Sequence, residues 1–234
     1  MGSFFLLSLK AGVSVIDISV WTDIFLRRLH ATFPNRVWFV GLQGSYSRGE
    51  ATDTSDIDMV VILDVLEPAD LIAYRGMLDT LAHRELICGF LSGRNVLMRW
   101  EPFDLFMLYY DTVPLYGTID SLLNLLDCEA VNRAIRVGAC NIYHGCVHNM
   151  LHGRQEETLR ELYKNALFVV QMITFRQTGK YIARSAELCE VAAPKEQEIV
   201  DICLGMKNGT SFDFDDTSIV LFQWAQGLIS EECI

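Results

Sequence analysis

The chain has no excess of positive charge and no long apolar run. Its 234 residues include 19 Lys and Arg against 30 Asp and Glu, a net charge of −11. A broad nucleic-acid surface needs Lys and Arg to neutralise phosphates, so we expect no extended nucleic acid as partner. No stretch reaches the roughly 18–20 apolar residues of a membrane span, and we expect no membrane insertion. These absences favour a small-molecule substrate.

Cysteine pairs with metal-binding or redox spacing are also missing. The seven cysteines are odd in number, form no Cys-x-x-Cys pair and lie partly in apolar stretches, which predicts buried, reduced thiols. Reduced thiols suit the cytosol, so a cytoplasmic location is expected. The apolar segment Phe4–Leu9 has no basic flank and no long apolar core, so it is not expected to be a signal peptide.

The N-terminal half combines strand and helix patterns. Predicted helices cover Ser14–Thr32 and Pro68–His83, and predicted strands cover Val37–Gly41, Asp56–Leu63 and Leu86–Leu91. Two interpretations fit Asn95–Tyr110. Either Phe103–Leu108 is a buried strand that carries one carboxylate, or Pro102 begins a helix that ends near Asp111. Pro114–Gly117 reads as a short closing strand or turn.

Strand signals stop near residue 118. Helices are predicted at Val131–His152, Glu156–Thr178, Pro194–Lys207 and Thr217–Glu232, with a short turn at Ala183–Val191. Their lengths and short loops suit an antiparallel bundle. With 51% apolar residues the chain can fill two cores, and we predict domains at 1–118 and 119–234.

The most informative stretch joins a Gly-Ser turn to two carboxylates. Gly44-Ser45 follows the strand at Val37, and Asp56-Ile57-Asp58 opens the next strand. Residues i and i+2 of a strand share a face, so the two aspartates project side by side. Adjacent carboxylates repel unless a cation lies between them, and hard oxygen ligands suit Mg²⁺. A phosphate cradle beside metal carboxylates is the equipment for phosphoryl or nucleotidyl transfer.

This pattern resembles the nucleotidyltransferase superfamily that includes DNA polymerase beta and the aminoglycoside nucleotidyltransferases, and most closely its minimal bacterial branch. The resemblance covers residues 37–64. It implies an α/β (α+β) fold: a mixed sheet flanked by helices, followed by the helical bundle. It also implies that Asp56 and Asp58 hold metal and that Gly44-Ser45 contacts nucleotide phosphate.

The family usually adds a third carboxylate on a later strand. Asp104 is the candidate, as base or metal ligand, with Glu101 as its substitute. If Leu86–Leu91 is instead the corresponding strand, it contains no acid, and Asp104 begins a helix.

Other candidates have plain structural alternatives. Arg48 follows the turn and could meet phosphate, or be an exposed arginine. Lys164 belongs to a Tyr-Lys pair common in helical domains fused to these transferases, although a surface lysine fits equally. His144, His148 and His152 share one helical face. A zinc site there is a weaker interpretation than a polar helix face.

The predicted function is Mg²⁺-dependent transfer of a nucleoside monophosphate from a nucleoside triphosphate, expected to be ATP, to a hydroxyl of a small molecule or a protein. The alternative is a catalytically weak, antitoxin-like or regulatory binding module on the same fold. The oligomeric state is open, with a homodimer considered.

Overall fold

The computed structural model describes residues 16–52 and 55–230 of the chain, which divides into two compact units. The first runs to Gly93 and includes the later segment Val113–Tyr116, while the second holds Arg94–Thr112 and the chain from Gly117 onward. The segment Phe4–Leu9 and the predicted helix start at Ser14 lie outside the described residues.

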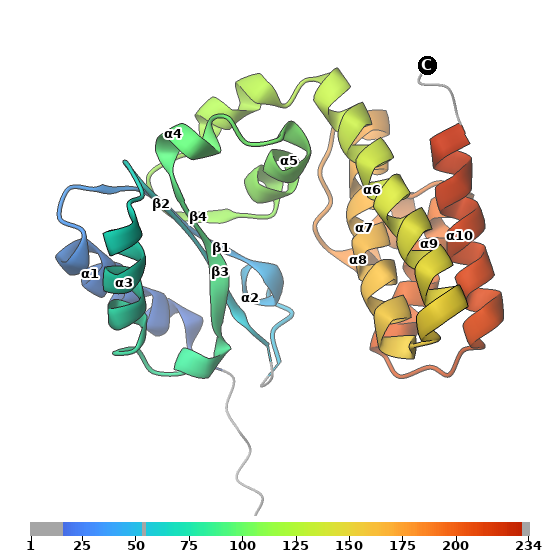
Figure 1. Ribbon diagram of the computed structural model, residues 1–234, viewed down its shortest axis with the longest axis horizontal. Helices are drawn as coiled ribbons and strands as arrows, with labels where there is room; N and C mark the ends of the chain where they lie inside the picture. The colour runs from blue at the N-terminus through green and yellow to red at the C-terminus, as the bar shows by residue number, and fades with distance from the viewer. Residues whose placement is uncertain (1–15, 53–54, 231–234) are drawn as a thin grey trace, which may run out of the picture. The chain divides into compact units, whose positions relative to one another are not determined.

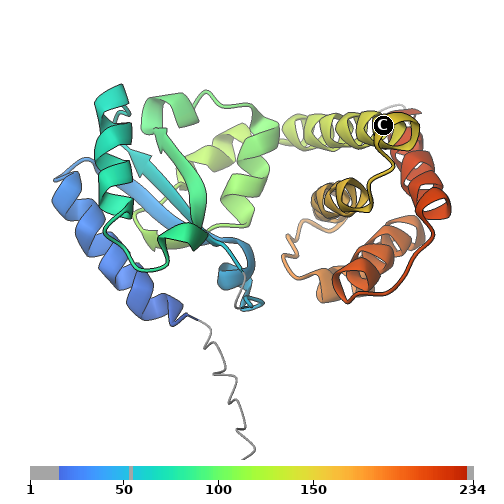
Figure 2. The same ribbon diagram turned by 60° about the horizontal axis from the view of Figure 1, so that its bottom comes forward.

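The first unit is a sheet with its two longer helices on one face (Figures 1 and 2). Its elements are α1 (Ile18–Thr32), β1 (Val37–Gln43), α2 (Gly44–Arg48), β2 (Ile57–Leu63), α3 (Pro68–Leu78), the 3₁₀ turn η1 (Arg84–Leu86), β3 (Ile87–Gly93) and β4 (Val113–Tyr116). The four strands are ordered β3-β2-β1-β4. Strand β1 is antiparallel to β2 and β4, whereas β2 and β3 are parallel. This mixed sheet confirms the predicted fold class.

Strand β2 has one face in the core of the first unit. Ile57, Met59, Val61 and Leu63 are buried there, packed with side chains of α1 and α3 such as Phe25. Burying each large side chain stabilises the fold by about 1.5–3 kcal/mol. The even-numbered residues of β2, beginning with Asp58, therefore point to the opposite face.

The Arg36 side chain links the start of β1 to the segment that follows β2. The Arg36 guanidinium donates to both carboxylate oxygens of Asp70, at 2.7 and 2.9 Å, and to the Val65 carbonyl at 2.9 Å. The Glu67 backbone N–H also donates to Asp70. These hydrogen bonds, the one from Arg36 above all, hold the pKa of Asp70 at about 2. The start of β1 is thereby tied to the start of α3.

The second unit is helical throughout its described residues. Its elements are α4 (Arg94–Leu97), α5 (Pro102–Tyr110), the 3₁₀ segment η2 (Asp120–Leu125), α6 (Cys128–His148), the π-helical turn η3 (Asn149–Gly153), α7 (Glu156–Thr178), α8 (Ser185–Val191), α9 (Pro194–Lys207) and α10 (Phe214–Ser230). Helix α6 packs against α7 and α10, and α7 packs against α9 (Figure 1). Buried Tyr163 of α7 donates its hydroxyl to the Thr217 carbonyl of α10 at 2.9 Å.

The two compact units have different bounds from the predicted domains 1–118 and 119–234, which stay a prediction. Helix α5 belongs to the second unit because its Phe106 side chain is buried in that unit's core. The Phe106 ring lies 5.1 Å from that of Phe175 and 6.0 Å from that of Tyr181, measured between centroids. The chain then returns to the first unit for β4 alone. A contact so distant in sequence leaves no trace in local pattern.

Several helix boundaries also differ from the predicted ones. Helix α3 ends at Leu78 rather than His83. Helix α6 begins at Cys128 because the Asp127 carboxylate accepts from the Ala130 N–H at 2.8 Å and caps it. None of the helices in the described residues is both long and apolar enough to cross a bilayer.

Candidate functional site

The Gly-Ser turn lies where β1 ends. Strand β1 stops at Gln43, Gly44 takes a φ of +72°, and α2 begins there. The Ser47 hydroxyl donates to the Gly44 carbonyl at 2.8 Å, and the Glu50 N–H donates to the Ser45 carbonyl at 2.8 Å. Both bonds fold the turn back on itself. The first N–H groups of a helix have no partner within the helix.

The two aspartates lie at the adjoining end of β2. Asp58 pairs directly with Gln43 across the antiparallel ladder, so it stands next to the residue that precedes the turn. Ile57 and Met59 are buried, whereas Asp56 is exposed and Asp58 half-buried. The alternation along β2 places the Asp58 carboxylate on the face opposite Ile57 and Met59, while Asp56 directly precedes the strand, and the shared face of the two carboxylates stays a prediction.

Asp58 and Gly44 are in direct contact. A Cβ atom built on Gly44 would lie 2.1 Å from Oδ2 of Asp58 and 3.1 Å from its Cγ. Any side chain at position 44 would displace this carboxylate. Glycine is therefore needed twice here, for the positive φ and for the approach of the acid. The fold brings the Gly-Ser turn and the Asp58 carboxylate together, with Asp56 two residues away in sequence.

The predicted nucleotide-binding cations both have carboxylate partners. Arg48 Nε lies 3.5 Å from Glu50 Oε2, close to the turn. Lys164 is on α7 of the second unit, where its Nζ pairs with Glu161 Oε1 at 2.5 Å and its side chain is 59% exposed. Their contacts with nucleotide stay predictions.

Asp104 does not lie on a strand. The strand interpretation is wrong, and the helical alternative is correct: Asp104 is in the first turn of α5, in the second unit. Its Oδ2 accepts a hydrogen bond from Trp100 Nε1 at 3.0 Å. Pro102 at the start of α5 favours a helix, and Leu105, Phe106 and Leu108 of the apolar run that resembled a strand are buried in it.

On the side of β2 away from β1 lies β3, which contains no acid. Cys88 pairs with Asp58 in the parallel register, so its exposed thiol lies on the same face as the carboxylate. This is the alternative in which Leu86–Leu91 is the corresponding strand and contains no acid, while the pairing of Cys88 with Asp58 depends on strand register, a tertiary property that the sequence did not predict. Across residues 16–52 and 55–230, no three His, Cys, Asp or Glu side chains are grouped to hold a metal.

The histidine face of α6 and η3 forms no such cluster either. The rings of His144 and His148 lie 6.4 Å apart, and those of His148 and His152 lie 5.1 Å apart, between centroids. All three side chains are exposed. The polar-face interpretation fits this arrangement, and a three-histidine zinc site does not.

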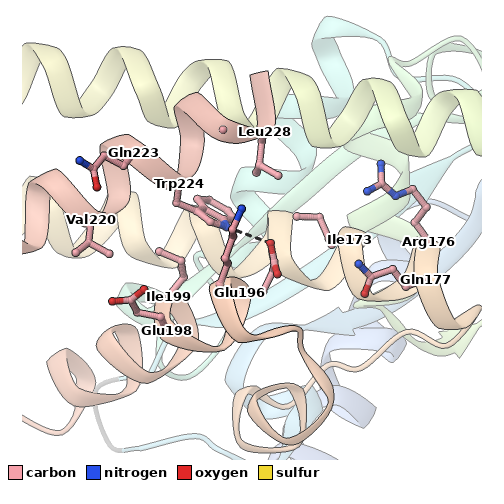
Figure 3. A pocket seen from close by; sticks show the side chains of 12 residues that line it. Ile173, Arg176, Gln177, Glu196, Glu198, Ile199, Val220, Gln223, Trp224 and Leu228 are labelled. Carbon is pink, nitrogen blue, oxygen red and sulfur yellow. Dashed lines mark hydrogen bonds between the residues drawn. The ribbon is translucent and has the colours of Figure 1, made fainter. Parts of the chain in front are cut away.

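The helical unit has a pocket of about 460 Å³ between α7, α9 and α10 (Figure 3). Trp224 forms part of its wall and donates through Nε1 to Glu196 at 3.4 Å. Arg176, Lys195 and Glu198 also line it, so charges of both signs face the same space. None of the predicted site residues belongs to this pocket.

Comparison with known proteins agrees with the geometry. Residues 23–94 match the family model of the nucleotidyltransferase domain. Spectinomycin adenyltransferase AAD(9) from Enterococcus faecialis, solved with ATP and spectinomycin, is 15% identical with a TM-score of 0.57, and the match covers 90% of this chain and 98% of that one. A nucleotidyltransferase-like protein from Exiguobacterium sibiricum 255-15 is 9% identical with a TM-score of 0.37, covering 91% and 74%. A search of curated proteins returns no match.

The matched range spans β1, the turn, β2 and β3, and so contains Gly44, Ser45, Asp56 and Asp58. This part of the chain is therefore similar to the nucleotidyltransferase domain, as the sequence predicts. The likeness to AAD(9) extends the shared fold over most of the chain.

Proposed function

We propose that this chain transfers a nucleoside monophosphate from a nucleoside triphosphate, with Mg²⁺, to a hydroxyl of a small molecule or a protein. One observation carries the proposal. The Asp58 carboxylate abuts Gly44, the first residue of the turn predicted to hold phosphate. A metal held by the acid would lie where phosphate oxygens could share it.

The residues present fit Mg²⁺. Proteins commonly hold this ion through one or two carboxylates, with substrate phosphates and water completing the shell. Asp56 and Asp58 would supply two carboxylates on one face, which is sufficient without a third. Bound Mg²⁺ would neutralise triphosphate charge and orient the reacting phosphate.

The turn has its own task. Its backbone N–H groups and the Ser45 hydroxyl would donate to phosphate oxygens of the nucleotide. Gly44 has no side chain, and any side chain at this position would collide with Asp58. Binding would thus align the triphosphate against the two carboxylates, and positioning of this kind is the larger part of catalysis in phosphoryl transfer.

ATP is the donor we expect, and a small molecule is the acceptor class. The similarity in fold to AAD(9), solved with ATP and spectinomycin, supports both choices. The test is turnover of ATP labelled at the α-phosphate, with a cellular metabolite extract as the acceptor source. A labelled adduct whose formation needs Mg²⁺ and Asp58 would support the proposal. If no labelled product forms with any of the four triphosphates, the proposal is contradicted.

A second candidate is a catalytically weak binding module. It is favoured by the absence of any acid in β3, the strand beside Asp58. A module of this kind would bind Mg²⁺ and nucleotide without turnover. The variant Cys88→Asp places a carboxylate next to Asp58 and distinguishes the binding module from the transferase. If a missing general base limits turnover, Cys88→Asp should raise turnover roughly 10²–10⁴-fold, the usual contribution of general-base catalysis, and Cys88→Ser should not.

A further inference from the structure

A second pocket of the helical unit, about 350 Å³ in volume, lies between α5, α6 and α7. Its volume is within the usual range of small-molecule sites. All of its lining residues belong to the one unit. The buried part of the lining is apolar and consists of Ile142, Leu162, Val169 and Met172.

The rim of this pocket is polar and carries a single charge. Asp104 of α5, Asn141 of α6 and Asn165 of α7 are all exposed at its edge. The Phe168 ring, 41% exposed, completes the rim. Trp100 Nε1 donates to Oδ2 of Asp104 at 3.0 Å, which restrains the exposed carboxylate.

The negative charge of Asp104 is not balanced by any positively charged residue that lines the pocket. The residues that line the pocket include no Lys, Arg or His, in contrast to the pocket of Figure 3, where Arg176 and Lys195 accompany two glutamates. The whole chain adds a net charge of −11, which attracts cations over longer range.

The geometry points to a binding site for a small organic ammonium ion with an apolar body. The ammonium group would donate to Asp104 in a charge-assisted hydrogen bond, and Asn141 and Asn165 would accept from its remaining hydrogens. The apolar body would cover the buried floor, and Phe168 would offer a ring face to the cation. This inference does not depend on the proposed transfer reaction.

Matched probes test the charge requirement. Tryptamine, indole-3-ethanol and indole-3-propionate share one ring system and carry a positive, a neutral and a negative end group. Isothermal titration calorimetry with the full chain should give roughly tenfold tighter binding of tryptamine than of the alcohol, with the acid weakest. The preference should shrink as salt is raised. Equal affinity for the amine and the alcohol, or no binding of the amine at millimolar concentration, would overturn the inference.

Matched variants test the location. Asp104→Asn should remove the preference for the amine over the alcohol. Asp23→Asn, which removes an exposed carboxylate of α1, should leave tryptamine binding as it is. Asn141→Trp should fill the mouth of the pocket and abolish binding, and thermal melting of each variant checks that it folds. Retention of full tryptamine affinity by either Asp104→Asn or Asn141→Trp would contradict the site.

Discussion

The two units differ in how far apart in the sequence their candidate site residues lie. In the first unit, residues 44–58 contain the whole candidate site, and a glycine and an aspartate from two neighbouring strands' ends touch directly. In the second unit, the pocket rim of Asp104, Asn141, Asn165 and Phe168 draws on three helices separated by long stretches of chain. A local motif can be recognised from sequence, whereas a site assembled from distant helices cannot.

The largest expected effect is confined to the first unit. Asp56→Asn or Asp58→Asn should lower transfer at least roughly 10³-fold, since either change removes a charge that holds the metal. The fold should survive, because both side chains lie outside the core and amides also relieve their repulsion. Turnover of labelled ATP and a thermal melt check the two parts. Turnover above one tenth of the wild-type rate in the double variant would show that the site lies elsewhere.

The second effect is on stability and tests the assignment of α5 to the helical unit. Phe106→Ala should destabilise the helical unit by about 3–5 kcal/mol, the usual cost of deleting a buried Phe. Hydrogen exchange should then speed up in α5, α6 and α7 more than in β1 and β2. Phe25→Ala, in the core of the first unit, is the matched control and should reverse the pattern. The same pattern from both variants would mean that the division into two units is wrong.

The third effect is on nucleotide affinity and distinguishes a steric clash with Asp58 from backbone strain alone. Gly44→Ala should weaken binding of Mg²⁺-ATP roughly ten- to hundredfold, because its Cβ would displace the Asp58 carboxylate. Gly49→Ala is the control: its φ of +71° imposes similar strain, about 1–2 kcal/mol, but no atom lies within 4 Å of the added Cβ. Equal losses of affinity in the two variants would assign the effect to strain alone.

These contrasts also explain what the sequence could predict. The spacing of Asp56 and Asp58 and the Gly-Ser turn depend on local geometry, so their placement at adjoining strand ends followed from residue order. The strand at Leu86–Leu91 and the long helices followed from periodicity. Asp104 was predicted less well, because a short apolar run fits a strand and a helix equally. The assignment of α5 to the second unit depends on Phe106 meeting Phe175 and Tyr181, a contact that no local pattern encodes.

The smallest effect depends on pH. The pKa of Asp70 is about 2 in the folded chain, below its unfolded value of about 3.9. The Arg36–Asp70 pair therefore stabilises the first unit fully above pH 4, and this contribution is lost as the pH falls toward 2. Asp70→Asn should be less stable than wild type at pH 7, and the difference should vanish near pH 2. Denaturant unfolding at pH 7, 4 and 2 checks this, and a difference that grows on acidification would contradict it.

The most direct test of the central claim is a thermal melt of the full chain with saturating Mg²⁺ and each of the four nucleoside triphosphates. A ligand that binds only the native state must stabilise it, by about 2.7 kcal/mol at a concentration 100 times Kd. For a chain of this length we expect Tm to rise by about 5–10 °C with at least one triphosphate. The rise should disappear in the Asp56→Asn, Asp58→Asn double variant. No rise with any triphosphate, or the same rise in wild type and double variant, would contradict a metal-nucleotide site at Gly44, Ser45, Asp56 and Asp58.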